Sequence, residues 1–311
     1  MEQPVTEIQE PAAGTGNPSV TGASVVRPAA ATAVSPQACA SCGTAPVANG
    51  GAQTTPTWVY ALGNIEARFP SISVEKEFFQ CSGREKLAGP DRAAFHAVLS
   101  KSEYRYLARQ LCFVMTVAGL ETYLLRPRDP GDFGLLVEAI RPHPSPLDLD
   151  AVIGVKGPIA PPEFCNGLMV PIVIFDQIYS FDREKLIKSI PKPAKGGGKE
   201  KEFETSAEEL FDRIRQMTDN AGATDEHRAL NYLAVRYDAI YAKAAEQFGN
   251  GASLTAVDVQ PSTLSGVRKV LDVIFSYTHR STDVVEKFFV RVDVTDEFPF
   301  LVTKLSPYYD R

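Results

Sequence analysis

The amino-acid sequence changes character at Trp58, which is the first aromatic residue of the 311-residue chain. Residues 1–57 contain four charged residues, seven prolines and six glycines, and most of the others are Ala, Thr, Ser and Val. A segment of this kind buries too little apolar surface to offset the ordering of its backbone, which costs about 1–2 kcal/mol per residue. We therefore expect a disordered tail or linker over residues 1–57 and one large folded domain over residues 58–311.

The same features restrict the class of protein. The tail lacks a basic start followed by an apolar core, so it is not a secretory signal. No run of about 18 apolar residues occurs, and this predicts a protein that does not span a membrane. A net charge of −6 disfavours a nucleic-acid partner, because binding to phosphates requires a basic surface. We expect a cytoplasmic protein.

Beyond Trp58 the sequence predicts an α+β fold. Its first half alternates short segments of both kinds: strands over 58–69, 111–125, 150–155 and 168–174, and helices over 73–79, 91–99, 102–111, 131–140 and 182–190. The second half places helices before strands. Clustered helices beside strands joined by short turns favour antiparallel sheets over a doubly wound parallel sheet.

The second half begins with the run PKPAKGGGKEKE over residues 191–202, which is typical of an exposed flexible loop. Ser206 and Glu209 then form a capping-box pattern, with Leu210, Ile214 and Met217 on one helix face. A second helix is predicted from 224 to 249. Strands follow over 267–278, 284–294 and 300–305.

Enzyme motifs are missing from the sequence. It has no phosphate-binding loop, no dinucleotide fingerprint, no H-E-x-x-H and no G-x-S-x-G. Of its four histidines, His227 and His279 are the better candidates for a general base, since Arg228 and Arg280 follow them in polar segments. A histidine in such a segment is more often a surface residue, so no catalytic residue is predicted.

The five cysteines leave two interpretations open. Cys39 and Cys42 have the C-x-x-C spacing that lets two thiolates bind one zinc ion, but one pair is half of a structural site. Cys165 with a further residue, or the same pair from a second subunit, would complete it. Alternatively, Cys39 and Cys42 are free thiols in the tail. An odd count without a secretory signal argues against a disulfide framework, and Cys112 is expected in the core.

Five segments together resemble one known family. They are WVYALGNIEARFPSISVEKEF, RYLARQLCFVMTVAGLETYLLRPRDP, GPIAPPEFCNGLMVPIVIFDQIYSF, TDNAGATDEHRALNYLAVRY and VEKFFVRVDVTDEFPFLVTKLSPYYDR. In these segments the chain resembles the C-terminal domain of unknown function of the cyanobactin maturation proteases, of the PatA/PatG type. In that family the domain follows a subtilisin-like protease that acts on a ribosomally made precursor peptide. The subtilisin motif is missing from this sequence, so no catalytic residue can be transferred.

The resemblance implies a role in the maturation of ribosomally made peptides. We expect an accessory, non-catalytic domain that binds the precursor peptide or a maturation enzyme, such as a protease or a cyclodehydratase, and that forms a homodimer. The alternative is a peptide-modifying enzyme, in a metal-dependent form using Cys39, Cys42 and Cys165. Polar residues at the ends of predicted elements are the candidate binding groups: Arg126, Arg128, His227, Arg228, His279 and Arg280.

Overall fold

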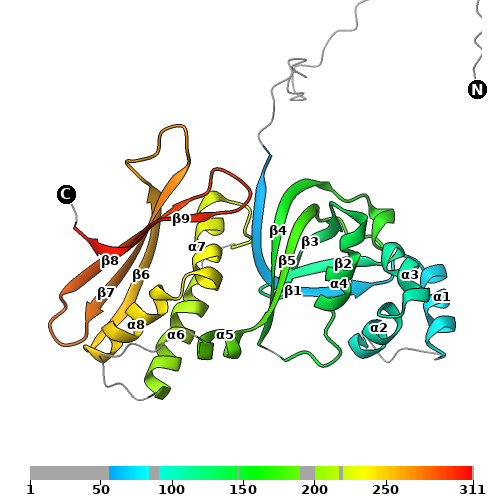
Figure 1. The fold of residues 1–311 in the computed structure, drawn as a ribbon, viewed down its shortest axis with the longest axis horizontal. Helices are drawn as coiled ribbons and strands as arrows, with labels where there is room; N and C mark the ends of the chain where they lie inside the picture. Colours follow the sequence, from blue (N-terminus) through cyan, green and yellow to red (C-terminus); the bar gives the residue numbers. More distant parts are fainter. Residues whose placement is uncertain (1–55, 84–90, 146, 190–199, 217–219, 310–311) are drawn as a thin grey trace, which may run out of the picture. The chain divides into compact units, whose positions relative to one another are not determined.

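The computed structural model describes residues 56–83, 91–145, 147–189, 200–216 and 220–309 (Figure 1). All described residues belong to one compact unit, Thr54–Arg311. The predicted tail up to residue 55 and most of the predicted loop over 191–202 lie outside the described residues.

The first half of the described unit is a closed five-stranded barrel. Its strands are β1 (Trp58–Arg68), β2 (Cys112–Val117), β3 (Leu120–Pro127), β4 (Asp148–Ile159) and β5 (Pro171–Asp182). They close in the order β1-β2-β3-β5-β4, with β3 and β5 parallel and all other neighbours antiparallel. Because the sheet closes on itself, this half has no free strand edge.

Strand β1 pairs with two neighbours in turn. Its first half, up to Gly63, pairs with β4, and its second half, from Asn64, pairs with β2. A side chain at Gly63 would collide with the carbonyl oxygen of Thr116 in β2, so only glycine allows this close approach. The long strand can therefore turn from one neighbour to the other and close the barrel.

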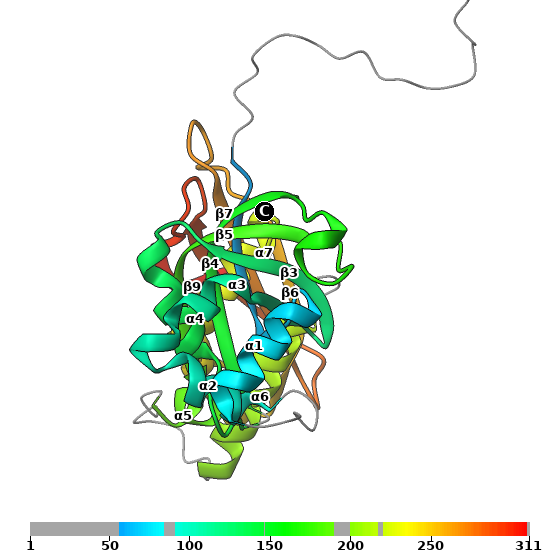
Figure 2. The same cartoon turned by 90° about the vertical axis from the view of Figure 1, so that its right-hand side faces the viewer.

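Short helices cover one side of the barrel (Figure 2). The connection from β1 to β2 holds α1 (Ile72–Ser82), α2 (Arg92–Leu99), η1 (Ser102–Tyr104) and α3 (Arg105–Gln110). The connection from β3 to β4 holds η2 (Pro130–Asp132) and α4 (Phe133–Ala139). The helices bury Phe78, Phe95, Leu107 and Leu136 against barrel residues. This strand order, with a helix between β3 and β4, is the topology of the OB fold, a small Greek-key barrel.

The second half is a four-stranded antiparallel sheet with helices on one face. The helices are α5 (Arg183–Ser189), α6 (Glu200–Arg215), α7 (Asp225–Arg236) and α8 (Ala239–Gly249). The strands are β6 (Ala252–Pro261), β7 (Val270–His279), β8 (Val285–Asp293) and β9 (Phe300–Tyr308), hydrogen-bonded in that order. No helix among the described residues has the length and apolar character needed to cross a membrane.

One hydrophobic core joins the two halves. Tyr60 and Leu62 of the barrel belong to the same buried cluster as Leu230 of α7 and Phe275 of β7. The side-chain amide of Asn231 in α7 donates to the carbonyl oxygen of Tyr60 at 2.8 Å, and the Tyr60 amide donates to the Gly222 carbonyl at 2.8 Å. The barrel is thus packed and hydrogen-bonded directly to the helical layer.

The predicted α+β class is confirmed, but several predicted elements are wrong in detail. The strand predicted over 111–125 is the hairpin of β2 and β3, turned by Ala118 and Gly119 with positive φ values of 50° and 84°. The helix predicted over 224–249 is two helices, α7 and α8, and strand β6 was missed. The predicted capping box is also wrong, because α6 begins at Glu200 and Ser206 is buried within it.

Candidate binding cleft

A cavity of about 620 Å³ opens on the barrel beside the beginning of α1. Its walls come from the end of β1, the first turn of α1, strand β3 and the 160–170 loop, which connects β4 to β5. We call this cavity the cleft. It is lined by Ala67, Arg68, Phe69, Ser71, Ile72, Glu75, Phe95, Glu121, Cys165, Asn166 and Leu168.

Part of the cleft is apolar and firmly packed. The Phe69 and Phe95 rings have centroids 5.1 Å apart, and both rings pack on Phe78, at 5.3 and 4.8 Å. Phe95 is buried in the barrel core, whereas Ile72 is 69% exposed on α1. The cleft can therefore receive an apolar side chain against aromatic rings that are already fixed in place.

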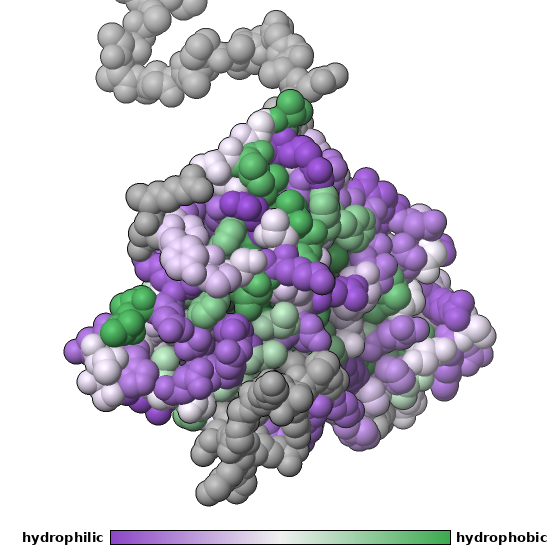
Figure 3. Space-filling view, turned by 60° about the vertical axis from the view of Figure 1, so that its left-hand side comes forward, coloured by the Kyte–Doolittle hydropathy of each residue, from purple (hydrophilic) through white to green (hydrophobic). Residues whose placement is uncertain are grey.

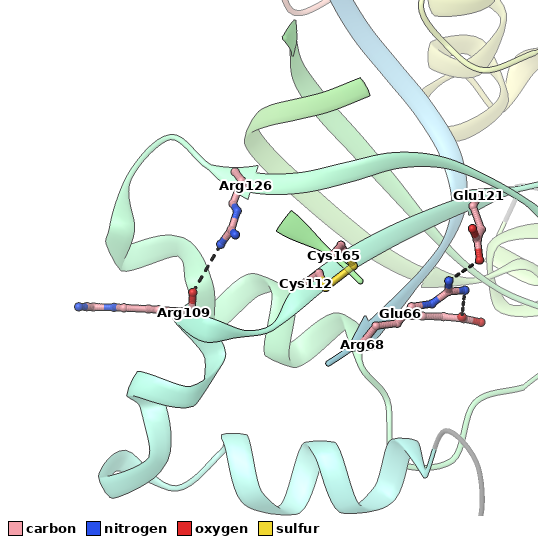
Figure 4. The surroundings of a disulfide bond; sticks show 7 residues. All are labelled: Glu66, Arg68, Arg109, Cys112, Glu121, Arg126 and Cys165. Carbon is pink, nitrogen blue, oxygen red and sulfur yellow. Dashed lines mark hydrogen bonds and ion pairs between the residues drawn. A yellow bond between two sulfur atoms is a disulfide. The ribbon is translucent and has the colours of Figure 1, made fainter. Parts of the chain in front are cut away.

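The polar part of the cleft is predominantly acidic. Arg68 forms ion pairs with Glu66, at 3.4 Å, and with Glu121 (Figure 4). Burial disfavours the charged form of Arg68, but the hydrogen bonds and charges of Glu121 and Glu66 outweigh burial and raise its pKa. Glu75 also lines the cleft. The lining therefore holds one guanidinium and two carboxylates, with Glu66 paired to Arg68 beside it, and the surplus negative charge favours a cationic group on a ligand.

A disulfide bond fixes the 160–170 loop. Cys112 of β2 is bonded to Cys165 of the loop, and both cysteines are buried, at 1% and 2% exposure (Figure 4). They form a small core with Val114, Leu124 and Ala160. The disulfide and this small core together attach the loop, as a wall of the cleft, to β2 and β3.

Arg126 reinforces the same wall from β3. Its guanidinium stacks on the ring of Phe164 in the loop at 4.5 Å. It also donates to the carbonyl oxygen of Arg109 at 3.5 Å, as Figure 4 shows. Burial lowers the pKa of Arg126. This predicted binding residue therefore supports the wall of the cleft through Phe164 and does not line the cleft itself.

The disulfide corrects two expectations about the cysteines. Cys165 was expected as a zinc ligand, but a sulfur bonded to Cys112 is not a thiolate and cannot bind the metal in this state. The expectation of no disulfide is also wrong, although Cys112 lies in the core as predicted. Cys39 and Cys42 lie outside the described residues. Within the described part of the chain, no three His, Cys, Asp or Glu side chains come close enough to hold a metal.

Two other predicted binding residues, Arg128 and Arg228, lie near one loop between β8 and β9. Arg128 forms a two-pronged ion pair with Asp176 of β5, with Nη2 to Oδ2 at 2.6 Å. Arg228 is only 1% exposed and donates to the carbonyl oxygens of Val294, at 2.8 Å, Asp296 and Glu297. Arg228 was expected to bind a ligand, but it is buried and holds the loop in place.

The remaining three predicted residues make contacts within the second half of the described unit. The backbone amide of His227 donates to Thr224 Oγ1 at the start of α7. His279 Nδ1 lies 3.3 Å from the Ser281 amide in the β7–β8 turn. Arg280 stacks on Phe248 of α8 at 4.4 Å and donates to Ser253 Oγ. None of these three residues lines the cleft.

The residues that form the cleft were not singled out in the sequence. Arg68 and Glu66 are two residues apart at the end of a strand, and this spacing places their side chains on the same face of the strand. The sequence therefore offered a local signal for this pair. Glu121 and Leu168 come from segments far apart in the sequence. These segments meet only in the closed barrel, so no local sequence pattern could predict that Glu121 and Leu168 line the same cavity as Arg68.

Comparisons with known proteins support the resemblance found in the sequence. Residues 197–308, which run from before α6 to the end of β9, match the PatG C-terminal family. A solved structure described as "PatG Domain of Unknown Function" has the same fold, with a TM-score of 0.66 and 19% sequence identity. The match covers 82% of this chain and 99% of the other. No curated protein matches the chain.

Proposed function

We propose that this chain has an accessory role in the maturation of ribosomally made, cyanobactin-like peptides. The proposal rests on the match of residues 197–308 to the PatG C-terminal family and on the fold that the chain shares with a PatG domain. The domain binds the precursor peptide and presents it to the enzymes that modify it. A cytoplasmic location stays part of the proposal, and because that compartment keeps most thiols reduced, it requires that burial protects the Cys112–Cys165 bond from reduction.

The cleft is the observation that carries the proposal. It has the volume of a small-ligand site, for which about 300–1,000 Å³ is typical, and it combines fixed aromatic rings with a few charged groups. Its lining residues include no histidine, and its cysteine is in a disulfide. Ser71 caps α1 and lies 2.8 Å from Ser73 Oγ. These residues suit binding better than nucleophilic chemistry.

A second candidate is binding of a maturation enzyme, such as a protease or a cyclodehydratase, in place of the peptide. The apolar residues exposed around β9, Phe298, Phe300 and Val302, favour it, because exposed apolar groups are common at protein interfaces. A homodimer and a structural zinc ion bound by Cys39 and Cys42 stay part of the proposal. With Cys165 in a disulfide, the two further zinc ligands would come from the same pair in a second subunit.

The proposal is tested with a fluorescein-labelled precursor peptide that carries its leader, core and recognition segments. We expect saturable binding to the full chain, measured by fluorescence anisotropy, and an unchanged mass of the peptide after incubation. Leu168→Ala should weaken binding about tenfold, since it removes an apolar side chain from the wall of the cleft without changing its charge.

The matched control is Leu264→Ala, which changes a 60%-exposed leucine of the β6–β7 connection and should bind like the unmodified chain. A change in the mass of the peptide would favour the enzyme alternative. Binding that is absent, or that both substitutions weaken equally, would contradict the proposed site.

A further inference from the structure

The cleft lies where a barrel of this topology has its ligand face. In OB folds, ligands bind the face of β2 and β3, between the loop that joins β1 to β2 and the loop that joins β4 to β5. Here these connections are residues 69–111, with α1 to α3, and the 160–170 loop. The cleft is lined by both connections and by Glu121 of β3, so geometry and topology identify the same surface.

The charge of the cleft disfavours the ligands that this fold usually binds. Nucleic acid carries a phosphate at each nucleotide, and its binding needs surplus positive charge. Among the charged residues of the lining, Glu75 and Glu121 outnumber Arg68, and Glu66 pairs with Arg68 beside the cleft, so a phosphate would meet net repulsion. A ligand with a cationic group would instead pair with Glu75 and Glu121, the two carboxylates that line the cavity.

The size of the cleft limits the form of the ligand. A cavity of about 620 Å³ holds a few residues of an extended chain, whereas a folded partner would need a far larger surface, about 800 Å² on each side. The aromatic rings of Phe69 and Phe95, with Leu168 of the loop, offer a place for one apolar side chain. An apolar residue beside a basic residue meets both requirements.

We propose that the cleft is the ligand face of an OB-type barrel and that it binds an extended peptide segment with an apolar side chain next to Lys or Arg. This inference rests on the proposed function and names the class of peptide. The apolar side chain packs on Phe69 and Phe95, and the basic side chain pairs with Glu75 and Glu121.

The fixed 160–170 loop makes such binding more favourable. The Cys112–Cys165 bond and the stacking of Arg126 on Phe164 hold Asn166 and Leu168 in place before any ligand arrives. A preformed wall reduces the conformational entropy that binding would otherwise cost. A short peptide segment, which makes few contacts, benefits most from this preorganisation.

Two matched peptides test the inference on the full chain. The first is fluorescein-labelled Leu-Lys-Leu-Lys-Leu-Lys, and the second has Glu in place of each Lys. We expect the Lys peptide alone to bind, as measured by anisotropy, with a Kd that rises about tenfold in Glu75→Gln and about tenfold in Leu168→Ala. Circular dichroism confirms that each variant is folded.

The control is Glu209→Gln, which removes the same charge from an exposed position on α6. It should leave the Kd of the Lys peptide unchanged. An equal loss in Glu75→Gln and Glu209→Gln would show attraction to the overall negative charge only, and equal binding of the two peptides would show that charge is not selected. Either result would overturn the inference.

Hydrogen exchange measured by mass spectrometry locates the peptide. Protection by the Lys peptide should fall on residues 66–75 and 160–170, whereas protection over β6 to β9 would overturn the inference. The labelled precursor peptide separates the two proposals. If it binds with protection elsewhere, the proposed function holds and the ligand face is wrong; if it does not bind at all, the proposed function fails as well.

Discussion

The guanidinium of Arg228 lies beneath the loop that joins β8 to β9, where the side chain is only 1% exposed. Burial is the main influence on its pKa, which is lowered, while the charge of Asp225 at 3.1 Å opposes that shift. Three backbone carbonyls also accept from it. A planar group with several donors can serve all of these acceptors at once, whereas a lysine cannot.

We therefore expect Arg228→Ala to lower the free energy of unfolding by about 3 kcal/mol, because it leaves buried carbonyls unpaired. Arg228→Lys should lower it by less, though still clearly. Urea unfolding followed by circular dichroism measures both. Glu226→Gln, at an exposed position of the same helix, is the control. If Arg228→Ala were as stable as this control, the structural role would be refuted.

At the scale of elements, the 160–170 loop is shaped by backbone geometry as well as by the disulfide. Asn166 and Gly167 have positive φ values of 47° and 91°, and the Gly167 amide donates to the Pro162 carbonyl at 2.7 Å. Asparagine and glycine adopt this left-handed region more readily than other residues. The loop is therefore a compact turn whose position on the barrel depends on Cys165.

Reduction of the disulfide should release this loop. A dithiol such as dithiothreitol would convert Cys112 and Cys165 to two thiols and would itself become a cyclic disulfide. We expect faster hydrogen exchange over 160–170 and a Kd for the Lys peptide that rises several-fold. The bond spans a separation of 53 residues, so its loss should cost about 4 kcal/mol of stability in the chain-entropy account.

The double variant Cys112→Ser with Cys165→Ser should reproduce the effect of reduction without a reductant. Cys81→Ser is the control, because Cys81 is the free cysteine of the described residues. If exchange over 160–170 were the same in the oxidised and the reduced chain, the disulfide would have no part in holding the loop.

Elements with a strong local pattern could be predicted from the sequence, and those defined by distant partners could not. Strand β1 and the strands β7 to β9 followed from runs of strand-forming residues bounded by turns, which are local signals. The β2–β3 hairpin was not predicted because residues 111–125 form one largely apolar run and the turn is only Ala118-Gly119. The cleft could not be predicted from the sequence for a different reason, because β1 and the 160–170 loop meet only after the barrel closes.

Two features of β9, at one edge of the second sheet, hinder the addition of a further strand. In β9, Pro307 has no backbone N–H, and the Leu305 amide donates to the Tyr237 hydroxyl at 2.9 Å. Both features remove donors that a further strand would need. This edge is therefore poorly suited to strand addition, although the face of the sheet shows small groups of apolar residues among hydrophilic ones (Figure 3).

Across the whole described unit, one charged cluster joins the barrel to the sheet. Arg128 and Asp176 belong to the barrel side, and Glu297 and Arg228 to the side of the sheet and helices. Burial first, and then the hydrogen bond to Asp176 and its charge, raise the pKa of Glu297 to about 7, while Arg128 and Arg228 oppose the shift. The Asp176 pKa is lowered, mainly by its hydrogen bonds with Arg128.

Stability should therefore fall as the pH rises towards neutrality. Glu297 titrates at about 7 when folded and near its ordinary value of 4.5 when unfolded, so the folded state keeps a proton that the unfolded state releases. Its contribution is complete below about pH 4.5 and is lost as the pH passes 7. Because the pKa of Asp176 is lowered, its own contribution to the pH dependence of stability lies at lower pH, outside this window.

The measurement compares melting temperatures at about pH 5 and about pH 8. The difference between these two values should be smaller in Glu297→Gln than in the unmodified chain, and Glu226→Gln should leave it unchanged. An equal pH dependence in Glu297→Gln and the unmodified chain would show that the cluster does not control it.

The pairing of β1 also has a consequence for how the chain is made. Trp58 pairs with Val155, and Tyr60 accepts from Asn231, which is 171 residues further along the chain. A strand that leaves the ribosome early must wait for partners that are synthesised much later. Contacts this far apart in sequence slow folding and prolong the exposure of apolar strands. During synthesis, Val59 and Leu62 are therefore natural contacts for a chaperone, long before the barrel and its helical layer are complete.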